Sequence, residues 1–171
     1  ANGLLASGEN DNYHLGVYGG GQWGALGLRT GASYTWHDVS TRRAVAYAGF
    51  VDRLTGDYQA GTAQVFGELG YRFDLARIAL EPFAGLAYVN LQTDGLREIG
   101  GVAALSGRGD DTRVGYSTLG LRASTSLGLG GMDLTLRGAL AWRHAFGDVN
   151  PAAALAFSGS NAFAVSGLPI A

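Results

Sequence analysis

Apolar and polar residues alternate with a period of two along six stretches of this chain. Three of the clearest are 26–36, 63–73 and 132–142. A β-strand points successive side chains to opposite faces, so each stretch predicts a strand with one apolar and one polar face. Each is about as long as a tilted strand that crosses a bilayer. The pattern therefore predicts the wall of a membrane β-barrel, with its apolar face toward lipid.

The whole set of expected strands has connections of alternating length. We expect strands at 13–20, 25–38, 62–74, 78–90, 114–129 and 132–146, and a weaker seventh from residue 152 into the tail. The connections at 20–24, 74–78 and 129–132 are short, whereas 39–61 and 91–113 are expected to be long loops. Outer-membrane barrels have short periplasmic turns and long outer loops. The expected fold class is all-β: an antiparallel meander of six to seven strands, forming part of a transmembrane β-barrel.

Charged residues occupy the polar positions of these strands. Lumen-facing charges are expected at Arg29, Glu68, Arg72, Glu81, Arg122, Arg137 and Arg143. On the lipid side each would cost about 2–4 kcal/mol at the midplane, so any barrel must place them inward. We expect them chiefly to stabilise the wall. A narrower hypothesis is that Glu68 and Glu81 face Arg72 and neighbouring arginines, presenting a wet surface to a passing extended chain.

Aromatic residues gather near both ends of the expected strands. Tyr34, Trp36, Tyr88 and Trp142 fall at the predicted outer ends, whereas Trp23 and Tyr71 fall near the predicted periplasmic ends. Aromatic side chains favour the two interfaces of a membrane. These six residues are therefore the expected aromatic girdle.

Composition narrows the possible functions. Glycine supplies 29 of 171 residues without a collagen period, which suits sheet curvature and tight turns. There are 12 basic and 14 acidic residues and no cysteine, so we expect no nucleic-acid partner and no thiol chemistry. No nucleotide, zinc or serine-nucleophile motif is present, and Asp110 and Asp111 lack enough acidic neighbours for calcium. We therefore expect no cofactor, no metal and no catalytic residue.

Three histidines supply the one enzymatic alternative. His14, His37 and His144 fall near predicted outer strand ends, and the last two lie close in sequence to Asp38 and Asp148. A histidine with a carboxylate can activate water, and outer-membrane proteases of the omptin type resemble this arrangement at the barrel rim. The same residues also suit ordinary interfacial and loop positions.

Taken together, five segments resemble the β-domain of an autotransporter of type V secretion. They are Asn12-Tyr-His-Leu-Gly-Val-Tyr-Gly-Gly20, Gly31-Ala-Ser-Tyr-Thr-Trp-His-Asp38, Gln64-Val-Phe-Gly-Glu-Leu-Gly-Tyr71, Leu80-Glu-Pro-Phe-Ala-Gly-Leu-Ala-Tyr-Val89 and Leu140-Ala-Trp-Arg-His-Ala-Phe-Gly-Asp148. The resemblance implies a barrel of about twelve strands when complete. Residues 1–171 would be a single partial domain, resembling the fourth to ninth strands and the start of the tenth. The pore helix, the first strands and the last strands would lie outside it.

The resemblance also implies a function and its partners. It implies a non-catalytic translocator and anchor in the cell outer membrane, which carries a linked N-terminal passenger to the surface. The implied partners are outer-membrane lipid, that passenger and the barrel assembly machinery. Self-association of this segment is a further possibility, because six or seven strands leave open edges in lipid. The alternatives are a surface porin or adhesin that binds through its long loops, and a soluble lipocalin-like β-barrel.

Overall fold

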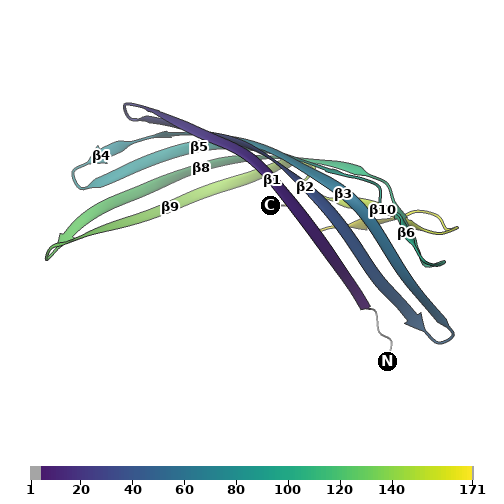
Figure 1. Cartoon of the computed structure of the whole chain (residues 1–171). Coiled ribbons are helices and arrows are strands. Elements are labelled where there is room, and N and C mark those ends of the chain that lie inside the picture. Colours follow the sequence, from purple (N-terminus) through teal and green to yellow (C-terminus); the bar gives the residue numbers. More distant parts are fainter. Residues whose placement is uncertain (1–4, 171) are drawn as a thin grey trace.

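The computed structural model describes residues 5–170, which are organised almost entirely as β-strands. The expectations for residues 1–4 and 171 lie outside this range. Six long strands form one antiparallel meander in the order β1-β2-β3-β5-β8-β9 (Figure 1). Their bounds are β1 Leu5–Trp23, β2 Leu26–Tyr47, β3 Phe50–Tyr71, β5 Ile78–Thr93, β8 Asp110–Leu129 and β9 Met132–Gly147. The all-β meander is confirmed. The described residues contain no helix that is long and apolar enough to cross a membrane.

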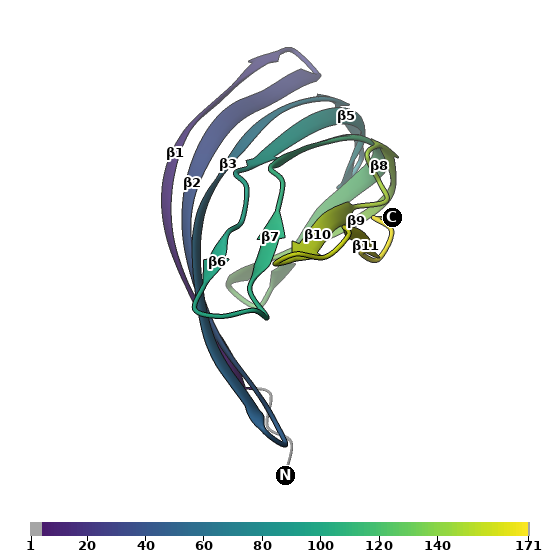
Figure 2. The same ribbon diagram turned by 90° about the vertical axis from the view of Figure 1, so that its right-hand side faces the viewer.

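The sheet is a single layer that curls into an arc (Figure 2). Residues 101–105 cover the inside of the arc, and they contact the side chains of Asp52 and Arg43. The face that carries these polar side chains is therefore the concave one. The opposite, convex face carries large apolar side chains, among them Leu69, Leu86 and Leu140, which are 50%, 66% and 80% exposed. A soluble barrel would bury such a face inside. The curvature therefore disfavours the lipocalin-like alternative.

Short turns close one end of the sheet, as expected. β1 and β2 are joined by Gly24 and Ala25, and β8 and β9 by Gly130 and Gly131 (Figure 1). The three glycines have φ values of +60°, +54° and +94°. Two-residue hairpins that follow the twist of a sheet need positive φ, which glycine adopts without steric cost.

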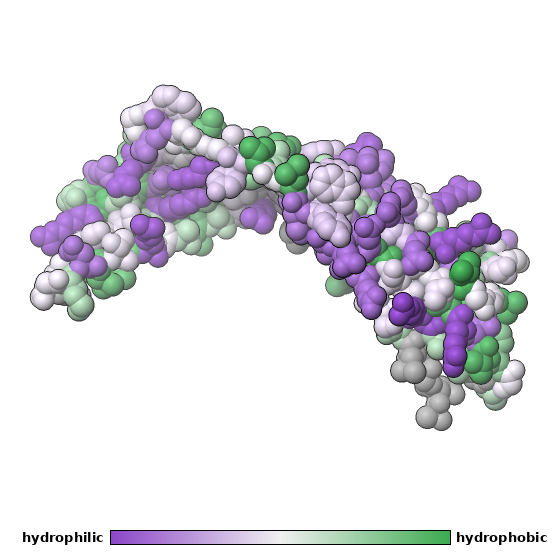
Figure 3. Space-filling model, viewed as in Figure 1, coloured by the Kyte–Doolittle hydropathy of each residue, from purple (hydrophilic) through white to green (hydrophobic). Residues whose placement is uncertain are grey.

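The expectation of a long loop at 39–61 is wrong. β2 continues to Tyr47 and β3 begins at Phe50, so most of this segment is a regular hairpin with its turn at Ala48 and Gly49. Figure 3 shows many hydrophilic residues, with hydrophobic ones between them, over the arm that carries it. A strand in water needs no apolar face toward lipid, so polar composition did not distinguish this hairpin from a loop.

The other expected boundaries need smaller corrections. The strand expected at 62–74 is interrupted at Arg72, giving β3 and a short β4 (Phe73–Leu75) that pairs with β5. The loop expected at 91–113 begins only after Thr93 and ends before Asp110. It also contains β6 (Glu98–Ile99), which pairs with β3.

The weak seventh strand exists but does not extend the wall. β10 (Ala152–Phe157) pairs with β11 (Phe163–Ser166) and with β7 (Leu105–Gly107), forming a separate three-stranded sheet. Phe157 and Phe163 stack at 5.5 Å between ring centroids. This sheet lies at the end opposite the short turns (Figure 1). The expected match of this segment to the start of a tenth wall strand is therefore not what the structure shows.

Candidate functional site

Four of the expected lumenal charges form one ion-pair network on the concave face. Arg29 of β2 lies opposite Glu68 of β3, and Glu81 of β5 lies opposite Arg122 of β8. Nη1 of Arg29 donates to Oε1 of Glu68 at 2.8 Å and to Oε1 of Glu81 at 2.9 Å. The Arg122 guanidinium donates to Glu68 Oε2 at 2.7 Å and to Glu81 Oε1 at 2.9 Å. Each carboxylate is shared by two guanidiniums, so the four formal charges cancel. We call these four residues the charge quartet.

A glycine and an aromatic ring allow the charge quartet to span four strands. A Cβ atom at Gly70 would lie 2.7 Å from Oε1 of Glu81, so a side chain there would displace the carboxylate that reaches across β3 to Arg29. On the other side, the Arg122 guanidinium lies 3.7 Å from the ring centroid of buried Phe83. A cation over a ring face is attracted to it. Small and aromatic neighbours therefore orient the arginines and glutamates.

The exposure of the charge quartet indicates its energetic role. The two glutamate side chains are 19% and 22% exposed, and the Arg29 and Arg122 side chains 49% and 34%. Single ion pairs at exposed sites contribute about 0.2–1 kcal/mol, and networks contribute more because one ordered side chain serves several partners. The arrangement can hold neighbouring strands in register and line a wet, electrically balanced wall. It contains no nucleophile or proton-transfer pair.

The remaining charges of the predicted set have other surroundings. Arg72 donates from Nε to Oδ1 of Asp74 at 2.9 Å. The hypothesis that Glu68 and Glu81 face Arg72 and neighbouring arginines therefore holds for the neighbours Arg29 and Arg122 and not for an ion pair with Arg72. Arg137 lies opposite Ser124, and Arg143 lies 6.0 Å from the ring centroid of Tyr116. Neither Arg137 nor Arg143 forms an ion pair within residues 5–170. Arg72 and Asp74 lie two residues apart and therefore share a face, because β4 continues the register of β3 against β5.

The six expected girdle residues share the convex face by strand alternation. Tyr34 and Trp36 contact edge to face at 4.6 Å between centroids, and Tyr71 packs on Phe73 at 4.7 Å. Trp23 adjoins the turn at Gly24 and is 63% exposed. Tyr88 and Trp142 lie toward the opposite ends of their strands and are also exposed. Membrane contact by these residues stays a prediction.

The histidines do not form the dyads that the enzymatic alternative requires. His14 Nδ1 bonds the Thr35 hydroxyl at 2.9 Å, and His37 bonds Asn12 and Thr62. Asp38 instead accepts from Gln59, because adjacent residues of a strand face opposite sides. His144 stacks on Trp142, and Asp148 accepts from the backbone N–H of Arg113. No group of three or more potential metal ligands occurs among the described residues.

Sequence reasoning missed an ion pair that fastens the loop between β5 and β8 to the long hairpin. Arg43 donates to Glu98 through Nε at 2.8 Å and Nη2 at 2.6 Å, and also to the Ala103 carbonyl at 2.7 Å. The backbone N–H of Leu105 donates to Glu98 at 2.8 Å. The hydrogen bonds from Arg43 lower the pKa of Glu98, against the opposing effect of burial. The two residues are 55 positions apart, and no local pattern marks the pair.

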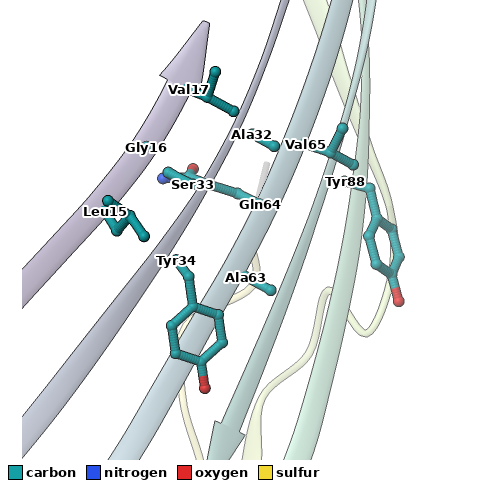
Figure 4. A pocket seen from close by; sticks show the side chains of 10 residues that line it. All are labelled: Leu15, Gly16, Val17, Ala32, Ser33, Tyr34, Ala63, Gln64, Val65 and Tyr88. Carbon is teal, nitrogen blue, oxygen red and sulfur yellow. The ribbon is translucent and has the colours of Figure 1, made fainter.

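The convex face has a shallow apolar groove of about 510 Å³ across β1, β2, β3 and β5. Figure 4 shows Ala32 and Ala63 in this groove, between larger side chains that include Leu15, Val17 and Tyr88. The groove exists because the side chains of these two alanines are shorter than those of their neighbours. Apolar lining without an acid or base suits hydrocarbon contact and offers no catalytic chemistry.

Comparison with known proteins identifies the family of this chain. The family described as "Autotransporter beta-domain" matches residues 1–171. Two proteins of Serratia marcescens, each named "Extracellular serine protease", are 41% and 40% identical over 169 residues. The match covers 98% of this chain and 16% of each relative, so the chain spans about one sixth of their length. The chain therefore belongs to the autotransporter β-domain family and is a translocator and anchor segment for a passenger domain.

Proposed function

We propose that the arc lies in the outer membrane with its convex face toward lipid and its concave face toward a water-filled lumen. The single observation that carries this proposal is the separation of faces: Leu86 and Leu140 are exposed on one side, and the charge quartet lies on the other. In this orientation Trp23 and Tyr71 lie at the periplasmic interface. Tyr34, Trp36, Tyr88 and Trp142 lie at the outer one.

The arc needs further strands to close. β1 and β9 each have one long-strand neighbour within the described residues, which leaves one backbone edge of each unpaired. In hydrocarbon an unpaired backbone group costs several kcal/mol, so such edges must be covered. We propose that residues 1–171 are one part of a barrel of about twelve strands and that other strands of the same protein complete it. A second copy of this segment is the other way to close the sheet.

We further propose that the passenger is an extracellular serine protease. This rests on the printed name of the two Serratia marcescens relatives, which match this chain over its barrel segment alone. The proteolytic residues would then belong to the passenger and not to residues 1–171. Outer-membrane lipid and the barrel assembly machinery are the remaining proposed partners, and both follow from the family.

The test is the mass of the native outer-membrane product that antibodies to residues 1–171 recognise, before and after protease treatment of intact cells. A product well above 17.7 kDa that is trimmed to a protected core of roughly twelve strands supports the translocator with a surface passenger. A product near 17.7 kDa contradicts the linked passenger. A porin or adhesin would instead give a heavier product without a separable surface domain.

A further inference from the structure

The concave face contains a second feature, a hollow of about 370 Å³ next to the charge quartet. Its floor consists of short side chains, Ala79, Ser124 and Ala139 among them, while Arg72 and Arg137 line its sides. Ala79 lies opposite Ser124, which in turn lies opposite Arg137, so three neighbouring strands supply one level of the hollow. We call this feature the arginine hollow.

The side chains that line the arginine hollow include three arginines and one glutamate, and two of the arginines have free donors. Glu81 and Arg122 border it, but they balance each other within the charge quartet. Arg72 uses only its Nε on exposed Asp74, and its two terminal nitrogens have no hydrogen bond within residues 5–170. Arg137 pairs with no carboxylate in the same part of the chain, although it shares its strand and face with Asp133. Two guanidiniums therefore present free donors to a space lined by small side chains.

We propose that the arginine hollow binds a carboxylate carried by the polypeptide that occupies the lumen, with an aspartate or glutamate side chain entering between Arg72 and Arg137. The proposal rests on the proposed function, because it needs the concave face to enclose a linked polypeptide. Guanidinium forks match carboxylates in planar geometry, and the alanine and serine floor leaves room for a side chain that descends from the lumen. A lipid phosphate does not fit, because lipid lies on the convex side.

The experiment uses the full-length protein in cells, with the photo-reactive residue p-benzoylphenylalanine in place of Ser126, which follows Ser124 on the same strand face and lies beside the hollow without lining it. After irradiation, mass spectrometry of the cross-linked peptide identifies the segment that reaches the hollow. We expect a peptide from outside residues 1–171 that contains an acidic residue. Arg137→Gln should lower the cross-link yield about tenfold, as expected for loss of a charged hydrogen bond. Arg143→Gln, on the same strand and face but outside the hollow, should leave the yield unchanged.

A charge exchange then separates an ion pair from mere proximity. Arg137→Glu should abolish the cross-link, and replacing the identified acidic residue by arginine in the same protein should restore it. A cross-link to a neighbouring wall strand or to lipid, or a yield that Arg137→Gln does not change, would overturn the proposal. Surface exposure of the passenger is measured on the same cells. A protein that displays its passenger without this cross-link refutes only the carboxylate site, whereas absence of any surface passenger refutes the proposed function.

Discussion

The assignment of faces is tested most directly by placing one arginine on each side of β9. Leu136 is 49% exposed on the convex face, near the middle of the stretch between the start of β9 at Met132 and the aromatic Trp142. The adjacent Thr135 lies on the concave face at nearly the same depth, opposite Ser126 and between Asp133 and Arg137. Thr135→Arg therefore matches Leu136→Arg in charge, size and depth and differs only in face.

The expected magnitude follows from the cost of an arginine at the bilayer midplane. That cost is about 2–4 kcal/mol on the lipid side, which corresponds to about a 30- to 900-fold lower insertion equilibrium for Leu136→Arg. On the lumenal side the guanidinium stays hydrated and has Asp133 two residues away. The insertion equilibrium of Thr135→Arg should therefore stay within about threefold of the unmodified protein, as is usual for surface substitutions of about 0.5 kcal/mol.

The assay is urea-dependent folding of the full-length protein into lipid vesicles, followed by the difference in gel mobility between folded and heated samples. Leu136→Arg should shift the folding midpoint to markedly lower urea, and Thr135→Arg should shift it little. Equal shifts would show that neither face contacts lipid preferentially. A larger shift for Thr135→Arg would show that the faces are reversed.

Three further predictions concern the charge quartet, the Arg43–Glu98 ion pair and the long hairpin. Glu68→Gln weakens charged hydrogen bonds to two arginines and should lower the free energy of unfolding by about 1–3 kcal/mol. The control Asp74→Asn changes an exposed ion pair and should lower that free energy by less than about 1 kcal/mol. Similar urea midpoints for the two variants would argue against a cooperative network. The pKa of Glu98 lies below its ordinary value of 4.5, so its bond to Arg43 stabilises the loop fully above that pH and the stabilisation is lost as pH falls through the lowered value. The protection factor of the Leu105 amide, which corrects for the pH dependence of unprotected exchange, should therefore fall only in acid. A low protection factor already at pH 7 would contradict a role of the Arg43–Glu98 ion pair in holding the loop. Protease added to intact cells should cut the long hairpin near Gly49 and not along its paired strands, whereas cuts spread evenly over 42–61 would contradict the hairpin.

Local alternation was enough to predict the six wall strands, their antiparallel order and the shared face of Arg29, Glu68, Glu81 and Arg122. The physical reason is that a strand sends every second side chain to the same side, so the face of a residue depends only on its neighbours in sequence. The turns at Gly24 and at Gly130 and Gly131 were equally local, because glycines at positive φ mark tight hairpins, whereas the turn at Gly49 lay in a segment expected to be a loop. The family resemblance agreed with these signals over the whole chain.

The partners of individual side chains depended on register and curvature, which no local pattern encodes. Glu68 and Glu81 were predicted to face Arg72 and neighbouring arginines, but only the neighbours Arg29 and Arg122 pair with them. Arg72 pairs instead with Asp74, two residues along the chain. Arg43 and Glu98 meet only because β6 pairs with β3 beyond the end of β5. The sequence by itself determined which residues share a face. Only the tertiary structure decided which of them touch and how long the strands are, because both depend on pairing between segments that are distant along the chain.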